Sequence, residues 1–458
     1  MRSSSKPLDR LPRFRSVARD HSQARVLVPL LAVSAALGVL SVNAPLVGVG
    51  TAIVVASLVL PRTVIVLSVS WVVLCRPGLE LVHIDVAGFS LTETDALLLA
   101  SLLAWVRLRS QRSGTPYPAK FWLVLFAWPI WMLIRAALPP QGLVQFASPF
   151  VDLHLLLTFM FALPISALIQ ANGRDWGVRW LCTLGYVACV VSIASWLGNT
   201  VGLLPYGQFA LVDVSPGPLT ARPGGELLIP VLAVLLALGK APLALKSRAF
   251  SIALVLGQVL VSQTLSIVLA IAAGIFAGAI ANWSSVRPIA RVLLVVILAT
   301  VALVASGLVG ADSRFNLSER GGEDSAQYRV SEFAAVSNII ERVPTVLLVG
   351  TGPGSVVQFE GLAIHEIKRD THNVLLTVVL KSGLIGAVLF VLPVLSAGAI
   401  AFKNRRRGMS SYFGAIAAIV VVSISVPFLW TSSGLLVAIL LWLSVSREPD
   451  STTIAKGE

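Results

Sequence analysis

Runs of apolar residues recur along almost the whole chain, and they constrain its fold more than any other feature. About fourteen such segments can be counted, from residues 26–42 to residues 435–445, and they include residues 180–204, 265–281 and 373–402. A helix that spans a membrane needs about 20 apolar residues. Hydrophobic residues make up 56% of the 458 residues and charged residues only 12%, which is too apolar for a soluble protein of this size. Several segments are short, so we expect an all-α polytopic membrane protein with about 12–14 transmembrane helices.

Basic residues stand in short clusters between the apolar segments, and these clusters set the expected orientation. The formal charge of +13 is spread over these clusters in the pattern of cytoplasmic loops, so we expect no nucleic-acid partner. With the N-terminus inside, the inner loops hold the following residues: Arg107, Arg109, Arg112 and Lys120; Arg174 and Arg179; Lys240, Lys246 and Arg248; Arg287 and Arg291; Lys403 and Arg405 to Arg407.

The orientation divides the chain into five expected parts and places it in the cytoplasmic membrane. In chain order they are a cytoplasmic basic tail (1–25), transmembrane helices (26–310), a long exoplasmic loop with short amphipathic helices (311–371), C-terminal transmembrane helices (372–446) and a cytoplasmic tail (447–458). Shorter outer loops are expected at residues 76–93, 139–149 and 205–225. The three cysteines form neither a disulfide framework nor a zinc spacing, and we expect no metal and no cofactor.

Two arginines lie in the outer loops, where few basic residues are expected. Arg222 stands in a turn rich in proline and glycine, before a segment that opens with Glu226, and a helix N-terminus favours anions. Arg329 lies in residues 328–342, whose apolar residues share one helical face, so we expect a helix along the membrane surface. Two plainer interpretations stay open: Arg222 meets lipid headgroups, and Arg329 pairs with Glu332 for about 0.2–0.5 kcal/mol.

A glycine-rich turn and a histidine follow in the long outer loop. The turn, residues 349–354, resembles a phosphate cradle, but it lacks the Lys-Ser/Thr of a P-loop, and most such turns only reverse the chain. His372 and Asn373 stand where the loop re-enters the membrane. An imidazole at a helix mouth can titrate near neutral pH and reach both water and lipid, although a single histidine is more often structural.

Two basic residues within apolar segments complete the candidates. Arg135 lies about one turn from the outer end of its expected helix, where Asp152 could pair with it or its side chain could snorkel to the interface. Lys381 lies about 13 Å beyond His372 along the next helix. A charge that deep costs about 2.5–3.5 kcal/mol and needs a partner or a cavity.

The order of these motifs resembles the O-antigen ligase and polymerase superfamily of bacterial membrane glycosyltransferases. His372-Asn373 is followed, after a spacer, by Gly383 and Gly386, which is similar to the His-Asn, spacer, Gly-x-x-Gly signature of the ligases. Arg329 stands in the position of the family's arginine with an amphipathic helix. Arg222 with Pro223 and Gly224 resembles the arginine of its earlier outer loop.

Two further stretches extend the resemblance, and two positions depart from it. Residues 350–354 are similar to the family's Gly-x-Gly turn, and residues 89–95 resemble its N-terminal Leu-Thr-x-x-Asp. The family often has Glu where this chain has Lys381, and a Ser-Arg pair where residues 262–266 read Ser-Gln-Thr-Leu-Ser. The roles that the family gives to those two positions are therefore not transferred here.

The resemblance implies a metal-independent transferase with a C-type glycosyltransferase fold and an active site on the exoplasmic face. It would move a glycan from a polyprenyl-diphosphate carrier to a hydroxyl of a glycan or lipid acceptor, within membrane lipids. Arg222 and Arg329 would stabilise the charge of the leaving diphosphate, and His372 would accept the hydroxyl proton. We expect four further residues to bind the substrate: Arg135, Gly352, Asn373 and Lys381.

Three alternatives stay open. A transporter or flippase of lipid-linked sugars would also have many spans and buried charges, and would place paired broken helices near the midplane. A metal-dependent glycosyltransferase could use His83 and Asp85 in an outer loop. A structural membrane scaffold would not explain arginines beside a helix-mouth histidine. Neither the sugar nor the choice between ligase and polymerase can be read from these residues.

Overall fold

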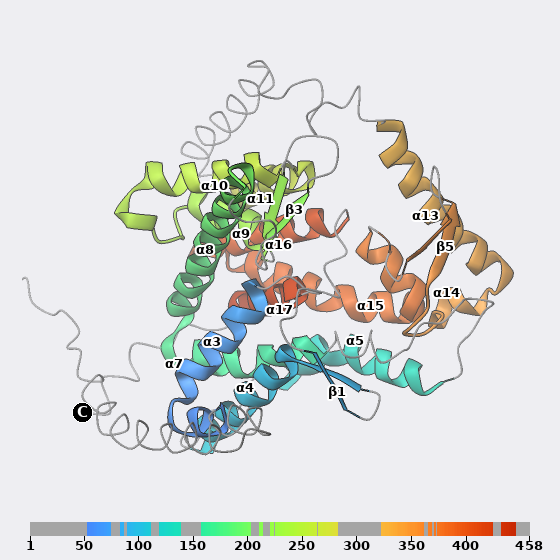
Figure 1. Ribbon diagram of the computed structural model, residues 1–458, viewed down its shortest axis with the longest axis horizontal. Coiled ribbons are helices and arrows are strands. Elements are labelled where there is room, and N and C mark those ends of the chain that lie inside the picture. Colours follow the sequence, from blue (N-terminus) through green and yellow to red (C-terminus); the bar gives the residue numbers. More distant parts are fainter. Residues whose placement is uncertain are drawn as a thin grey trace, which may run out of the picture.

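The computed structural model describes residues 53–74, 83–86, 89–110, 119–138, 157–202, 210–213, 220–223, 225–262, 264–282, 322–360, 365–368, 371, 373–424 and 432–445 (Figure 1). The described part is mainly helical, as expected. Its labelled α-helices are α3 (Pro61–Leu74), α4 (Glu93–Ser110), α5 (Ala119–Ala137), α7 (Ala162–Asn172), α8 (Arg174–Thr200), α9 (Leu228–Ala237), α10 (Arg248–Ser262), α11 (Leu265–Ala281), α13 (Gly322–Arg342), α14 (Thr345–Val349), α15 (Val374–Lys403), α16 (Ser410–Ser423) and α17 (Ser432–Val445). Short 3-10 turns are η1 (Thr158–Phe161), η2 (Ala244–Lys246) and η4 (Arg405–Arg407).

Among the described residues, three short antiparallel hairpins accompany the helices, and the sequence patterns did not predict them. They pair β1 (His83–Val86) with β2 (Phe89–Thr92), β3 (Ala210–Asp213) with β4 (Thr220–Pro223), and β5 (Val357–Glu360) with β6 (His365–Lys368). Each hairpin lies within a loop that the charge pattern assigns to the outer side. Within these polar connections, the strands therefore pair their backbone groups across each hairpin.

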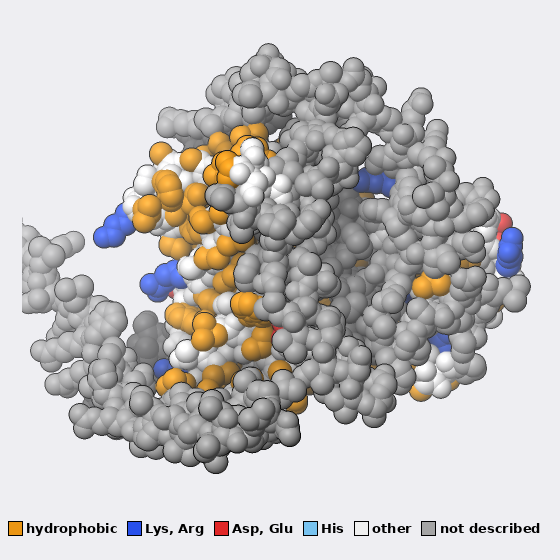
Figure 2. Space-filling view, in the orientation of Figure 1, with side chains coloured by type: hydrophobic (Ala, Val, Ile, Leu, Met, Phe, Trp, Pro, Cys, Tyr) orange, Lys and Arg blue, Asp and Glu red, His pale blue; other side chains and the backbone are white. Residues whose placement is uncertain are grey.

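Two described helices, α8 and α15, are long and apolar enough to cross a membrane. Large apolar side chains are exposed along several helices, among them Leu123 on α5, Phe276 on α11 and Val388 on α15, which are 72%, 61% and 64% exposed. In Figure 2, hydrophobic side chains cover much of the left side of the view, with Lys and Arg projecting at its edge. Apolar surface this extensive is typical of a protein that contacts lipid or another apolar partner.

The interior is built around α9, all of whose residues are buried. A helix that is apolar on every side belongs inside a bundle, and α9 packs against α8, α10, α11 and α16. Helices α11 and α16 approach closely through glycines. A methyl group added at Gly274 would stand 2.7 Å from the carbonyl oxygen of Gly414. Small residues at such crossings allow the close backbone packing that membrane helices use.

The Leu-Thr-x-x-Asp stretch serves as the start of α4. The carboxylate of Asp95 accepts hydrogen bonds from the backbone N–H of Thr92 at 2.8 Å and from its hydroxyl at 3.1 Å. A carboxylate that returns to the residue preceding the helix satisfies a donor that helical bonding leaves open. This stretch therefore has a local structural explanation, independent of any family resemblance.

Helix α15 joins the region of α13 and α14 to the helices around α16. In Figure 1 it runs from α13, α14 and β5 on the right towards α16 near the centre of the view, with α5 beside it. Its 30 residues would span about 45 Å as an uninterrupted helix. The hydrocarbon core of a membrane is about 30 Å thick, so the two ends of α15 can stand at opposite faces of a bilayer.

Candidate functional site at the break in α15

Helix α15 is broken within its first half. Gly383 has φ 67° and ψ −172°, which no helical residue adopts, and the helix resumes directly after it. Such a break deprives the preceding carbonyl groups of the N–H donors that would face them one turn later. Because these groups are buried, other partners must supply the missing hydrogen bonds.

The glycine-rich turn after α14 supplies two of these partners. The N–H of Thr351 donates to the carbonyl of Leu380 at 2.7 Å, and the N–H of Gly352 donates to that of Lys381 at 3.0 Å. The hydroxyl of Thr351 donates to Leu380 as well, at 2.9 Å. These N–H groups are therefore engaged with α15. The backbone N–H groups of Thr351 and Gly352 are thus not available to bind a phosphate, as the phosphate-cradle interpretation of the turn would require.

Helix α5 supplies the third partner. The indole N–H of Trp131 donates to the carbonyl of Ser382 at 2.9 Å, and that of Trp128 donates to the Ser382 hydroxyl at 3.1 Å. Three successive carbonyls of α15 thus accept hydrogen bonds from outside the helix. The break is consequently a fixed structural joint, in which the turn, α5 and α15 hold one another.

Glycine is required on both sides of this joint. A methyl group at Gly350 would lie 2.4 Å from the carbonyl oxygen of Lys381, and one at Gly383 would lie 2.2 Å from that of Leu348. Both glycines also have positive φ, at 77° and 67°, where a side chain adds strain. Gly350 of the turn and Gly383 of the Gly-x-x-Gly pattern therefore allow two backbones to touch.

Arg135, on the last turn of α5, is buried at the same joint. Its side chain is 1% exposed, and one terminal nitrogen, Nη2, donates to the carbonyl of Gly350 at 3.0 Å. Its Nε is buried and makes no hydrogen bond within the described residues. The Arg135 side chain is therefore buried within the protein and does not snorkel. The expected partner Asp152 lies outside the described residues.

Lys381 and Glu332 bring two further charges into the same interior. Lys381 is fully buried and Glu332 is 1% exposed, and their helices, α15 and α13, pack together through Leu380 and Val336. Buried charges are stable only where opposite charges or hydrogen bonds compensate them. Two basic side chains at the joint, Arg135 and Lys381, and the acidic side chain of Glu332 on α13 are thus all buried.

Asn373 has a defined structural task at the start of α15. Its side-chain oxygen accepts hydrogen bonds from the N–H groups of Leu375 and Leu376, at 2.9 and 3.2 Å, as expected of an N-cap. The hydroxyl of Thr371 donates to the Asn373 carbonyl at 2.8 Å. His372 lies outside the described residues, but hydrogen bonds hold the residue on each side of it. Because the side-chain oxygen is engaged in this cap, Asn373 would bind substrate through its amide nitrogen.

Arg329 lies on the expected helix, α13, with its side chain exposed. The predicted apolar face is partly exposed and partly packed on the protein. Val330 and Phe333 are 67% and 62% exposed, whereas Glu332 and Val336 are buried. The exposed apolar residues are available to a membrane surface, and Arg329 lies at the edge of that strip.

Arg222 belongs to a different region of the described fold. Its strand, β4, pairs with β3 and packs against α8 and α10, and Ser192 on α8 donates to the carbonyl of Ala221 at 3.0 Å. The side chain of Arg222 lies outside the described atoms. The structure therefore brings Arg135, Gly352 and Lys381 together. The predicted convergence of Arg222, Arg329 and His372 stays a prediction.

Comparisons with known proteins supply no family for this chain. No protein-family model matches it, and no curated protein matches its sequence. Within the described residues, no three His, Cys, Asp or Glu side chains are grouped so as to hold a metal ion. The function must therefore be argued from the joint itself and from the residues that surround it.

Proposed function

We propose that this protein is a polytopic membrane enzyme, similar in architecture to C-type glycosyltransferases, that transfers a glycan from a polyprenyl-diphosphate carrier to an acceptor hydroxyl at the outer membrane face. The observation that carries the proposal is Arg135. A guanidinium buried at an interhelical joint, with Nε unpaired among the described residues, is suited to a phosphate oxygen. Lys381 adds a second buried cation.

Apolar surface next to the joint fits the carrier's polyprenyl chain. Leu133 and Ile134, which precede Arg135, are 55% and 47% exposed, and Leu384, which follows Gly383, is 45% exposed. In a membrane these side chains would face lipid. A lipid-borne diphosphate could then reach the joint sideways while its hydrocarbon chain remains in the bilayer.

The proposed reaction is a displacement at the anomeric carbon. The acceptor oxygen forms a bond to that carbon, the bond from the carbon to the phosphate oxygen breaks, and its electron pair leaves with the polyprenyl diphosphate. His372 takes the proton of the acceptor hydroxyl. Arg135 stabilises the negative charge that grows on the diphosphate. Arg222 and Arg329, which no contact among the described residues places beside Arg135, are proposed to reach the same diphosphate from the outer loops.

A transporter of lipid-linked sugars is the second candidate, because a broken helix is also typical of transporters. In transporters the carbonyls freed by the break often coordinate ions or substrate. Here the carbonyls of Leu380, Lys381 and Ser382 already accept hydrogen bonds from Thr351, Gly352 and Trp131. This occupancy favours a structural joint beside a reaction site over an open transport site.

Glycan transfer by the purified protein tests the proposal. We expect the wild type to transfer glycan from a polyprenyl-diphosphate donor with or without a chelator. His372→Ala is expected to lower the rate by about 10²–10⁴-fold, and Arg329→Ala and Arg222→Ala by about 10²–10³-fold each. Arg342→Ala, on the same helix as Arg329 and equally exposed, is the matched control and should retain activity.

Two results would count against the proposal. Full activity in all three variants, at normal expression, would exclude the catalytic roles assigned to His372, Arg329 and Arg222. If the wild type transfers no glycan but moves the donor across proteoliposome membranes, the chain is a transporter. Chelator-sensitive transfer would instead favour a metal-dependent enzyme.

A further inference from the structure

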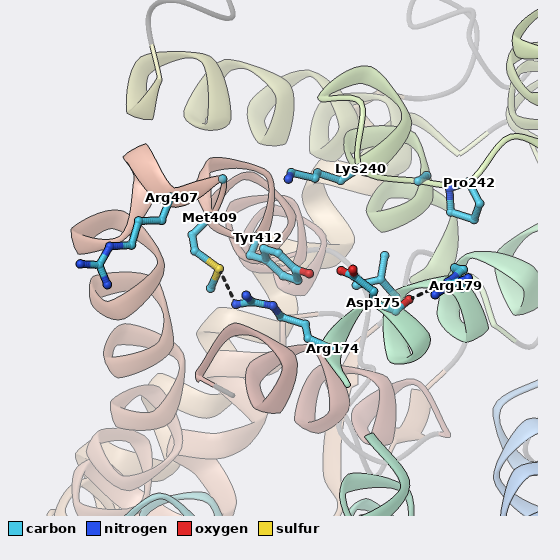
Figure 3. Close-up of a pocket in the computed structure, with 11 residues that line it drawn as sticks. Arg174, Asp175, Arg179, Lys240, Pro242, Arg407, Met409 and Tyr412 are labelled. Atoms are coloured by element: carbon cyan, nitrogen blue, oxygen red, sulfur yellow. Dashed lines mark hydrogen bonds between the residues drawn. The ribbon is translucent and has the colours of Figure 1, made fainter. Parts of the chain in front are cut away.

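A basic cavity of about 310 Å³ lies at the opposite end of α15 from the joint (Figure 3). Three chain segments line it: the start of α8, the connection between α9 and α10, and the connection between α15 and α16. These segments are far apart in sequence, so the cavity is a product of the fold. All three carry basic clusters that the positive-inside pattern predicts at the inner membrane face.

The cavity is strongly positive. Arg174, Arg179, Lys240 and Arg407 line it, against one carboxylate, that of Asp175. Figure 3 shows Lys240 extended along one side and the guanidinium of Arg174 beneath Tyr412. Arg179, Lys240 and Arg407 are exposed, and such a concentration of like charge attracts anions.

Arg174 is held in place by its neighbours. One of its terminal nitrogens lies 2.9 Å from the sulfur of Met409, and its guanidinium carbon lies 5.7 Å from the ring centre of Tyr412. Arg179 donates from Nε to the backbone carbonyl of Asp175 at 3.3 Å. The N-terminal end of α8 lies at the cavity too, and its backbone adds a field of the same sign.

Exposed apolar side chains adjoin the cations. Leu243 and Leu245, shortly after Lys240, are 42% and 80% exposed, and Phe402, before the α15–α16 connection, is 40% exposed. A free anion gains nothing from these side chains. A phospholipid has both parts that the surface offers to bind, a phosphate for the cations and acyl chains for the apolar rim.

The position along α15 matches the depth of a lipid headgroup. As a straight helix, α15 would rise about 45 Å over its 30 residues, which is about the thickness of a bilayer with its headgroup regions. If the start of α15 stands at one face of the bilayer, the cavity stands at the headgroup level of the other. Anionic lipids at the cytoplasmic face are attracted to basic pockets between helices.

We propose that this cavity binds the phosphate headgroup of an anionic phospholipid. Binding would hold α8 and the ends of α10, α15 and α16 in their relative positions. The proposal does not depend on glycan transfer, because a transporter or scaffold with this fold would have the same cavity.

Lipid titration of the purified full-length protein tests the proposal. The protein in a neutral detergent is titrated with dioctanoyl phosphatidylglycerol, with dioctanoyl phosphatidylcholine or with inorganic phosphate, and Tm and bound lipid, by native mass spectrometry, are measured. We expect phosphatidylglycerol alone to raise Tm and to remain bound. The double variant Arg174→Gln/Lys240→Gln should bind it roughly tenfold or more weakly.

The matched control removes the same number of positive charges from residues that lie beside the cavity but do not line it. Lys403→Gln/Arg406→Gln changes two exposed residues that do not line the cavity, and it should bind phosphatidylglycerol like the wild type. If the first variant fails to fold, Arg179→Gln/Arg407→Gln changes two exposed lining residues and serves in its place. Equal effects of phosphatidylcholine, of phosphate, or of the control variant would each overturn the proposal.

Discussion

Gly383→Ala is expected to destabilise the protein by about 3 kcal/mol or more, which should lower Tm strongly or prevent folding. A methyl group there would lie 2.2 Å from the carbonyl oxygen of Leu348, and backbone atoms cannot move away as a flexible side chain can. The positive φ of Gly383 adds about 1–2 kcal/mol. Separating the two backbones would also break the bonds from Thr351 and Gly352, each worth about 0.5–1.5 kcal/mol.

A control at Gly202 distinguishes the cost of the backbone contact at Gly383 from the cost of its positive φ. Gly202 has φ 72°, and a methyl group there would meet no atom within 4 Å, so Gly202→Ala should cost only about 1–2 kcal/mol. Thermal unfolding in detergent, followed by fluorescence, compares the two variants. Equal Tm values would show that the turn and α15 do not touch at this joint.

Arg135→Gln is expected to retain most of the stability of the protein and to lose glycan transfer by about 10²-fold or more. Glutamine keeps an N–H group that can approach the carbonyl of Gly350, now bound by Arg135 at 3.0 Å, but it carries no charge for a diphosphate. Arg135→Ala is expected to lose transfer as well and about 1–3 kcal/mol of stability, because a buried carbonyl then has no partner.

Comparing the Tm and the transfer rate of these two variants distinguishes the roles of Arg135. A purely structural arginine predicts that Arg135→Gln, once folded, transfers glycan at the wild-type rate. That result would remove the observation on which the proposed function rests. Arg342→Ala again serves as the control, because this arginine is exposed at the end of α13, whereas the joint is formed by α5, α15 and the turn after α14.

The helices could be predicted where an apolar run alone defines them. Residues 265–281 were expected as one segment, and α11 has these bounds. Both ends of α15 lie within a few residues of its predicted segment. Helix α8 ends within a few residues of its predicted segment but begins earlier. Local periodicity carries this information because each residue's environment repeats along the helix. The hairpins were missed, since four-residue strands within polar loops leave little pattern to read.

The joint could be predicted only in part, because its decisive contacts join residues far apart in sequence. The glycines at 350, 352, 383 and 386 stood out, but nothing local shows that residues 351–352 bind the carbonyls of residues 380–381. The same limit affected α13. Its apolar pattern predicted one face that includes Val330, Phe333 and Val336, but it could not show that Val336 packs with Leu380 of α15 or that Glu332 is buried.

The most direct test of the central claim is the side of the membrane on which each end of α15 lies. In a variant without the native cysteines, Glu341→Cys on α13 and Arg406→Cys beside the basic cavity each provide one exposed thiol. A membrane-impermeant maleimide added to intact spheroplasts is expected to label residue 341 only, and residue 406 only after lysis. Labelling of both positions from the same side, or of residue 406 alone from outside, would contradict an outer reaction site and an inner lipid site.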